Sequence, residues 1–164
     1  MSTNSATAPH PSQQFLKFLL PPNVNVMLAT DRITEILNLN VNQIVPIPQV
    51  SSEVIGVSNW RGEVLWLIDL GELLKVEPLH HQNSQAIDYR TLVIHHSNGC
   101  LGLVINQVSQ TLWCNPVEIQ RLSETQRTNQ RSRCLQGYWS SSEGETIWVL
   151  DCDAVVNVLQ GRSG

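Results

Sequence analysis

Two stretches of this chain share one pattern: GEVLWLID at residues 62–69 and GETIWVLD at residues 144–151. Each begins with glycine and glutamate, continues as an apolar run of strand length and ends on an aspartate. Asp69 and Asp151 each precede a segment with helical spacing of apolar residues, which is where an N-cap belongs. The chain therefore contains an internal repeat of a strand followed by a short helix.

The repeat extends to the N-terminal side of both stretches. The segments 15–19, 26–33, 44–47 and Gly56 match, in that order, 91–95, 101–108, 114–117 and Gly137. The spacing between the copies varies, as loops of unequal length require. Two copies are too few for a solenoid, so the repeat predicts two small β-barrels, or one fused pair with a common core. In either arrangement we expect Trp66 and Trp148 at equivalent positions.

Short apolar runs separated by glycine, proline, asparagine or serine dominate the chain, which is typical of barrels and sandwiches. The predicted strands are 15–20, 24–29, 43–47, 54–59, 64–68, 91–95, 101–105, 108–113, 135–140 and 146–150. Helical spacing is confined to 69–74 and 151–159. The uninterrupted apolar character of 64–68 and 147–150 predicts that these strands are buried on both faces.

Composition narrows the class of protein. The chain has 164 residues, of which 41% are hydrophobic and 15% charged, and its net charge is −4. A pI of about 5.7 disfavours nucleic-acid binding, which usually needs a basic surface. No apolar run approaches the ~20 residues of a membrane helix, so we expect no direct membrane insertion. Residues 1–14 are uncharged and rich in Ser, Thr, Pro and Gln, and we interpret them as a disordered tail of a cytoplasmic protein.

Catalytic and metal-binding patterns are weak. The four cysteines lie apart from one another, without the paired spacing of a zinc site, so we expect free thiols and no metal. They are Cys100, Cys114, Cys134 and Cys152. The chain has no nucleophile elbow, phosphate loop or dinucleotide-binding motif. The sequence therefore predicts no enzyme and no cofactor, and it places the five tryptophans in cores or at a subdomain interface.

Two polar segments interrupt the predicted strands. Residues 75–90 include His80 and His81, and residues 121–133 contain four arginines. The arginine-rich segment is either a solvated loop or a contact with an acidic partner.

Residues 54–70, VIGVSNWRGEVLWLIDL, resemble a signature of the CheW-like family, the coupling proteins of bacterial chemosensory arrays. The family pattern reads approximately hydrophobic-x-G-V-x-N-L-R-G-x-hydrophobic-x-P-V-I-D-L. Three further segments are similar to family motifs: 33–36 (ITEI), 44–48 (IVPIP) and 101–108 (LGLVINQV). The resemblance extends over residues 15–159.

This resemblance implies a mostly β fold of two five-stranded SH3-like β-barrels packed around a shared core, with short helices. Residues 15–164 are then one CheW-like domain, with subdomains at about 15–90 and 91–159 and a C-terminal helix at 151–159. The resemblance also implies a non-enzymatic adaptor that couples the cytoplasmic tip of methyl-accepting receptors to a CheA-type histidine kinase. Such adaptors serve chemotaxis, phototaxis or type IV pilus motility. Other CheW-like proteins and a response regulator are further candidate partners, and the expected location is the cytoplasm, with recruitment to membrane receptor arrays.

The resemblance assigns a set of partner-binding residues. These are Ile33, Glu35, Ile36, Asn59, Trp60, Arg61, Val104, Asn106 and Val108. Within the set, Glu35 and Arg61 are expected close together at the receptor-binding face, with Ile33 and Ile36 supplying apolar contact. An exposed ion pair contributes only ~0–1 kcal/mol of stability, which favours a role in recognition; a pair that only pins the hairpin is the alternative.

Three residues depart from the family pattern. Trp60 stands in place of Leu, Trp66 in place of Pro and Asn106 in place of Asp, which indicates a specialised paralogue. One alternative function is a scaffold that has lost receptor coupling and binds a response regulator or a pilus motor regulator. Another is a ligand-binding or enzymatic β-barrel, which a deep polar pocket with converging titratable groups would favour.

Overall fold

The computed structural model describes residues 12–76 and 87–161. The strands are β1 (Gln13–Leu20), β2 (Val24–Ala29), β3 (Ile33–Asn40), β4 (Val54–Trp60), β5 (Glu63–Asp69), β6 (Asp88–His96), β7 (Gly99–Ile105), β8 (Gln107–Cys114), β9 (Gln120–Arg121), β10 (Leu135–Ser140) and β11 (Thr146–Leu150). The helices are α1 (Leu70–Leu73), α3 (Gln130–Arg133) and α4 (Cys152–Gly161), with 3₁₀ turns η2 (Thr30–Arg32), η3 (Val41–Gln43), η4 (Pro116–Glu118) and η5 (Glu124–Gln126).

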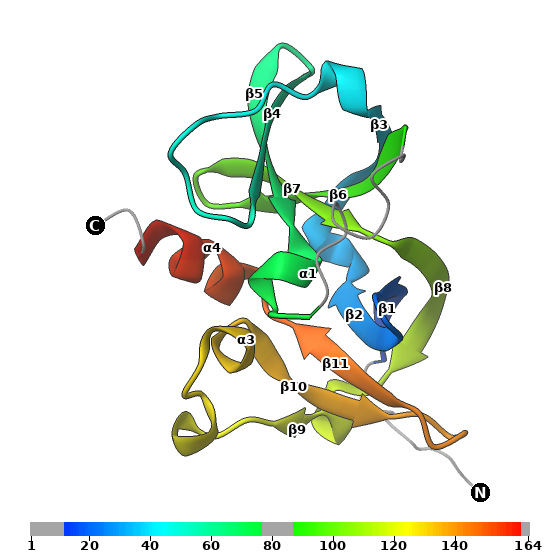
Figure 1. Ribbon diagram of the computed structural model, residues 1–164. Coiled ribbons are helices and arrows are strands. Elements are labelled where there is room, and N and C mark those ends of the chain that lie inside the picture. Colours follow the sequence, from blue (N-terminus) through cyan, green and yellow to red (C-terminus); the bar gives the residue numbers. More distant parts are fainter. Residues whose placement is uncertain (1–11, 77–86, 162–164) are drawn as a thin grey trace, which may run out of the picture.

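The strands form two sheets that Figure 1 shows one above the other, with α1 and α4 between them. One sheet has six strands in the order β8-β1-β2-β11-β10-β9, and the other has five in the order β3-β6-β7-β5-β4. The expected mostly β fold of two subdomains is confirmed. Within the described residues, hydrogen-bonded pairing does not close either sheet into a complete barrel.

Each sheet combines strands from both copies of the repeat. The first copy places β1 and β2 in the six-stranded sheet but β3, β4 and β5 in the five-stranded one. The second copy does the reverse: β6 and β7 join the five-stranded sheet, and β8, β10 and β11 join the six-stranded one. When each strand is replaced by its counterpart in the other copy, the order β8-β1-β2-β11-β10 becomes β3-β6-β7-β5-β4. The two sheets therefore have the same strand order, and β9 is an additional edge strand. The predicted division near residue 90 separates the two copies of the repeat but not the two sheets, because each copy crosses from one sheet to the other after its second strand.

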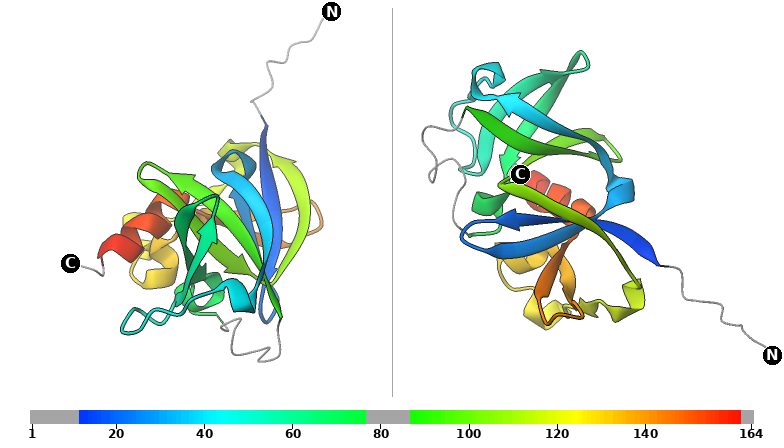
Figure 2. Two further views of the ribbon diagram at one scale, coloured as in Figure 1. Left: turned by 90° about the horizontal axis from the view of Figure 1, so that it is seen from above. Right: turned by 90° about the vertical axis from the view of Figure 1, so that its right-hand side faces the viewer.

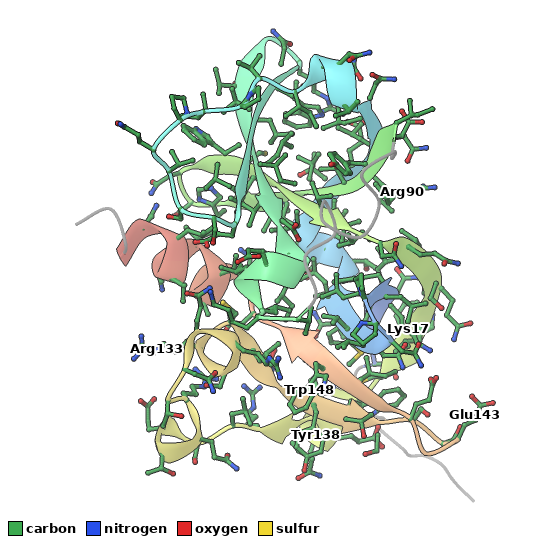
Figure 3. The ribbon with its side chains drawn as sticks, viewed as in Figure 1. Lys17, Arg90, Arg133, Tyr138, Glu143 and Trp148 are labelled. Carbon is green, nitrogen blue, oxygen red and sulfur yellow. The ribbon has the colours of Figure 1, made fainter. Side chains whose placement is uncertain are left out.

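Strands β5 and β11 occupy the same place in their sheets. Each pairs antiparallel with the strand before it and parallel with a strand of the other copy. Gly56 and Gly137 lie opposite the residues that follow Trp66 and Trp148, so the expected equivalence of the two tryptophans is confirmed. Their surroundings differ: Trp66 is 41% exposed, whereas Trp148 packs against the shared core. Trp148 also makes a T-shaped contact with Tyr138, with ring centroids 5.6 Å apart, and Figure 3 labels both residues.

Apolar side chains are divided between a shared core and two smaller ones. The largest cluster lies between the sheets and receives side chains from both sheets, α1 and α4. A smaller cluster lies on the other face of each sheet. Leu16 and Phe18 of β1 enter the shared core while Phe15 enters the smaller one, as the alternation of a strand requires. Helix α4 completes the shared core and lies beside α3 and β6 (Figure 2).

Several elements differ from the sequence-based expectation. Strand β3 was not predicted. The predicted strand 43–47 begins at the last residue of η3 and contains only a single bridge, from Val45 to Val57. Residues 64–68 are not buried on both faces, because Val64 is 68% exposed and Trp66 faces outward beside it. Among the tryptophans, Trp113 is also exposed, at 64%. The predicted tail of residues 1–14 lies outside the described residues up to position 11, and β1 already begins at position 13.

The helix caps are confirmed. The side chain of Asp69 accepts a hydrogen bond from the backbone N–H of Glu72 at the start of α1, at 3.1 Å. Asp151 accepts one from the N–H of Ala154 at the start of α4, also at 3.1 Å. Both aspartates therefore satisfy helix N-terminal donors, which assigns them a structural role.

Candidate protein-interaction site

A two-residue hairpin turn carries the candidate site. Strands β4 and β5 pair as far as Trp60 opposite Glu63, which leaves Arg61 and Gly62 as the turn. Both turn residues have positive φ, 53° and 80°, as a type I′ turn requires. Asn59 stabilises the turn by accepting a hydrogen bond from the N–H of Gly62 at 3.2 Å. A non-glycine residue in this left-handed conformation costs on the order of 1–2 kcal/mol of stability. The turn therefore places the Arg61 side chain at the expense of stability.

Glu35 of β3 brings this turn into contact with the opposite edge of the sheet. Its Oε1 accepts a hydrogen bond from Trp60 Nε1 at 3.0 Å and another from Arg61 Nη2 at 3.0 Å. The guanidinium also lies over the indole, with Arg61 Cζ 4.6 Å from the ring centroid. Glu35 and Arg61 are thus as close as the family resemblance implies, and Trp60 is bonded to the same oxygen. We refer to these three residues as the Glu35 cluster.

The Glu35 cluster connects the two edge strands of the five-stranded sheet. Strands β3 and β4 are the two edges of this sheet, and no backbone pairing joins them within the described residues. Glu35 lies on the face of β3 that carries Leu37 and Leu39 into the sheet's own small core, and Trp60 packs against the same core. The three side chains therefore connect the edges at a point where the backbone does not.

The electrostatics of the cluster give little stability. The side chains of Arg61 and Glu35 are 62% and 36% exposed. An ion pair at such exposure contributes ~0–1 kcal/mol, and an exposed cation–π contact ~0.5–1 kcal/mol. These gains are of the same size as the conformational cost of Arg61. Strained residues of this kind are concentrated at functional sites.

Apart from Asn59, which stabilises the turn, the other predicted partner-binding residues do not gather around the cluster. Ile36 is 40% exposed but lies on the opposite face of β3 from Glu35, because consecutive residues of a strand alternate. Ile33 and Val108 are half-buried against the shared core. Asn106 is exposed in the turn that follows β7.

Val104 does not belong to a binding surface. Its side chain is 0% exposed and forms part of the small core of the five-stranded sheet. All residues from 101 to 105 are buried, because β7 lies between the shared core and this small core. The assignment of Val104 to partner contact is therefore wrong.

A second surface, outside the predicted partner-binding residues, lies on the face of β4 and β5 that is turned away from the small core of their sheet. Val45, Val57 and Trp66 lie in one row across three neighbouring segments, since Val45 bridges Val57 and Val57 lies opposite Trp66. Val64 is on the same face, two positions from Trp66 along β5. We refer to these four residues as the Trp66 surface. The sequence pattern does not distinguish the exposed residues of this surface from buried ones, because Val64 and Trp66 alternate with buried leucines in one uninterrupted apolar run.

A groove of about 600 Å³ adjoins the Trp66 surface. It is lined by Gln49, Val50, Ser51, Val54, Trp66, Ile68, Leu101, Leu159 and Gln160. None of these side chains is charged, and the groove and the surface together form an apolar area of the kind that marks protein contacts.

The arginine-rich segment is not a simple solvated loop. Arg131 donates from Nε to the carbonyl of Leu74 at 2.6 Å and from Nη2 to the carbonyl of Lys75 at 2.8 Å. Gln130 donates to the carbonyl of Leu73 at 2.8 Å. These bonds satisfy carbonyls at the C-terminal end of α1, where a positive charge is also favourable. Arg131 therefore has a structural role.

A charged cleft of about 400 Å³ lies near the N-terminus of α4. Its charged lining residues are Asp31, Arg32, Arg121, Arg127 and Asp151. Arg32 donates from Nη2 to Asp153 Oδ1 at 2.8 Å and to the carbonyl of His95 at 3.2 Å. The hydrogen bond from Arg32 lowers the pKa of Asp153 below its ordinary value. These bonds connect η2, where the chain crosses from one sheet to the other, to α4 and β6. Because Asp151 caps α4, both Arg32 and Asp151 have structural roles in this cleft.

All four cysteines lie in the described residues, and none of them forms a disulfide bond there. Burial raises the pKa of Cys114 to about 11 and that of Cys152 to about 12, which keeps both protonated and unreactive near neutral pH. Across residues 12–76 and 87–161, no group of three or more His, Cys, Asp or Glu side chains is arranged to hold a metal ion. No helix in the same residues is long and apolar enough to span a membrane.

Comparison with known proteins identifies the class. A model of the CheW-like domain family matches residues 14–160, and the chain therefore belongs to the CheW-like domain family. Among solved structures, the chain is similar to the scaffolding protein TtCheW from Thermoanaerobacter tengcongensis, with a TM-score of 0.72 and 16% sequence identity. That similarity covers 86% of this chain and 90% of the other, and it concerns the fold. No curated protein sequence gives a significant match.

Proposed function

We propose that this chain is a non-enzymatic adaptor of a chemosensory array, which couples the cytoplasmic tip of a methyl-accepting receptor to a CheA-type histidine kinase. Membership of the CheW-like family supports the adaptor role. The adaptor acts in the cytoplasm, is recruited to membrane receptor arrays, and serves chemotaxis, phototaxis or type IV pilus motility.

The Glu35 cluster is the observation on which this proposal depends. Three side chains from two sheet edges meet at one carboxylate oxygen, yet the exposed pair adds little stability and Arg61 is held in a strained conformation. Recognition of a partner accounts for such an arrangement better than stability does. The separate Trp66 surface offers a second contact area, as a protein that joins two partners requires.

Binding measurements with the Arg61→Ala variant test the proposal. Calorimetric titration with a cognate receptor cytoplasmic fragment should show about tenfold weaker binding or more, because a hydrogen bond to a charged group is worth ~1.5–3 kcal/mol. The melting temperature should fall by only a few degrees, as expected for ~1 kcal/mol in a domain of this size. Arg133→Ala is the matched control, since Arg133 is an exposed arginine on α3, away from the cluster.

Two outcomes contradict the receptor assignment. If Arg61→Ala binds the receptor fragment as the wild type does, the Glu35 cluster is not the receptor site. If the wild type binds neither receptor nor kinase fragments but co-elutes with a response regulator or a pilus motor regulator, the chain is the scaffold that has lost receptor coupling. The neutral Asn106 favours that second function to the extent that receptor coupling depends on the family's Asp at this position.

A further inference from the structure

Trp60 occupies a position where the CheW-like pattern has leucine, and it contributes what leucine cannot. Its indole N–H donates to Glu35 Oε1, and its ring supports the Arg61 guanidinium. The indole itself is fixed, because it packs against the small core of the five-stranded sheet. Trp60 therefore holds both charged members of the Glu35 cluster, whereas each of them alone is a partly exposed side chain with several free torsions.

The bonds within the cluster leave part of its hydrogen-bonding capacity unused. Oε1 of Glu35 accepts both bonds, and its Oε2 has no partner among the described residues. Arg61 uses only Nη2 in hydrogen bonding to the described residues, so its Nε–H and Nη1–H groups remain as donors. An acceptor and donors thus lie side by side at the surface, and their formal charges cancel.

We propose that Trp60 is a positioning residue for partner recognition, which holds Glu35 and Arg61 so that together they bind one carboxamide or peptide group of the partner. A carboxamide offers an N–H for Glu35 Oε2 and a carbonyl for Arg61, and it has no net charge to match. A lysine on the partner could bind only Glu35, and a glutamate could bind only Arg61. This inference rests on the proposed receptor site, and it adds the residue that shapes that site and the chemistry that the site accepts.

The first test uses the free protein and needs no partner. In two-dimensional ¹H–¹⁵N NMR spectra, the indole N–H of Trp60 should exchange with solvent more slowly than that of Trp113, which is 64% exposed and has no hydrogen bond from its indole among the described residues. Glu35→Ala should remove the protection of Trp60 and leave Trp113 unchanged. If the Trp60 indole exchanges as fast in the wild type as in Glu35→Ala, the positioning bond does not exist in solution and the inference is overturned.

The second test measures binding to the cognate receptor fragment. Trp60→Phe keeps an aromatic ring under Arg61 and removes only the N–H donor, and we expect roughly tenfold weaker binding. Trp60→Leu also removes the ring and should bind more weakly still. In a double-mutant cycle, Trp60→Phe should have little further effect in the Glu35→Ala background. Trp113→Phe, a change of the same chemistry on the other sheet, is the control.

The outcomes separate this inference from the proposed function. If Arg61→Ala weakens binding but Trp60→Phe does not, the receptor site stands and the positioning role of Trp60 is wrong. If neither variant affects binding, the proposed receptor site is wrong. Circular dichroism spectra of each variant establish that it is folded, and if Trp60→Phe does not fold, the exchange measurement on the wild type still decides whether the indole holds Glu35.

Discussion

Gly137 is a position at which one added methyl group should damage the fold. It lies in β10, and β9 runs close against it. A Cβ at residue 137 would lie 2.8 Å from the carbonyl carbon of Gln120 and 2.9 Å from the Cα of Arg121, and closer still to the carbonyl oxygen of Gln120. Real Cβ atoms do not approach backbone this closely, so in Gly137→Ala strand β9 has to move away.

The expected loss of stability follows from what holds β9 in place. Strand β9 pairs with β10 at Gly137 and Tyr138, and Leu122 donates to the carbonyl of Gln136 at 3.1 Å just beyond it. Separating the strands breaks two or three backbone hydrogen bonds, worth about 1 kcal/mol each. Staying paired instead imposes an overpacking strain of about 1–3 kcal/mol. We therefore expect Gly137→Ala to lower the free energy of unfolding by about 2–4 kcal/mol, or the melting temperature by about 5–15 °C.

Urea unfolding followed by tryptophan fluorescence measures this difference. Gly161→Ala is the matched control, because nothing lies within 4 Å of a Cβ at the end of α4, and its effect should be within about 1 kcal/mol of zero. Gly56→Ala should behave like Gly137→Ala, since Val45 approaches Gly56 as β9 approaches Gly137. A Gly137→Ala variant as stable as Gly161→Ala would show that β9 does not pack on β10 in the way described.

Three further predictions concern the caps, Arg131 and the buried thiols. Asp69→Ala and Asp151→Ala should each lower the free energy of unfolding by ~0.5–2 kcal/mol in urea titrations, because each leaves a helix N–H without its acceptor. Arg131→Met keeps the apolar stem but leaves the carbonyls of Leu74 and Lys75, just after α1, without their donor, and should lower the free energy of unfolding by about 1–3 kcal/mol. Cys114 and Cys152 should resist alkylation at pH 8 in the folded protein and react after unfolding. Because their pKa values are raised to about 11 and 12, stability should fall as pH rises from about 9 toward 12, where the unfolded thiols lose protons first.

Each of these has a result that contradicts it. Unchanged urea midpoints for both aspartate variants would mean that the caps contribute nothing. An effect of Arg131→Met no larger than that of Arg133→Met would mean that the carbonyl contacts are not formed. Rapid alkylation of Cys114 or Cys152 at pH 8 in the folded protein would mean that these thiols are accessible.

The repeat was the part of the fold that the sequence predicted best. Matching GEVLWLID with GETIWVLD predicted that β5 and β11 are equivalent and that an aspartate caps the helix after each. Local composition also placed most strands. It failed for β3, where asparagine and threonine alternate with the apolar residues and weaken the strand signal. It also failed for 43–47, because Pro46 and Pro48 cannot donate to a ladder and pairing there is reduced to one bridge at Val45.

The pairing between strands that lie far apart in the chain could not be predicted from the sequence. The repeat indicated which strands correspond, but not that each copy would contribute two strands to one sheet and three to the other. The same limit applies to the site. The family resemblance implied that Glu35 and Arg61 meet, whereas the hydrogen bond from the Trp60 indole to the same oxygen joins the two edge strands of the sheet, which no local pattern expresses. Burial of Val104 depends on two cores meeting at β7, which no local pattern expresses.

The exchange of strands between the two copies has a consequence for the origin of the fold. A single copy cannot form a complete sheet, because its first two strands belong to one sheet and its last three to the other. An ancestor encoded by one copy of the gene segment could fill both sheets only by associating with a second molecule like itself. Duplication and fusion of the segment would then have converted an intertwined dimer into one polypeptide. By the same logic, two polypeptides produced by dividing the present gene between α1 and β6 should each remain incomplete alone and assemble into the full domain when they are expressed together.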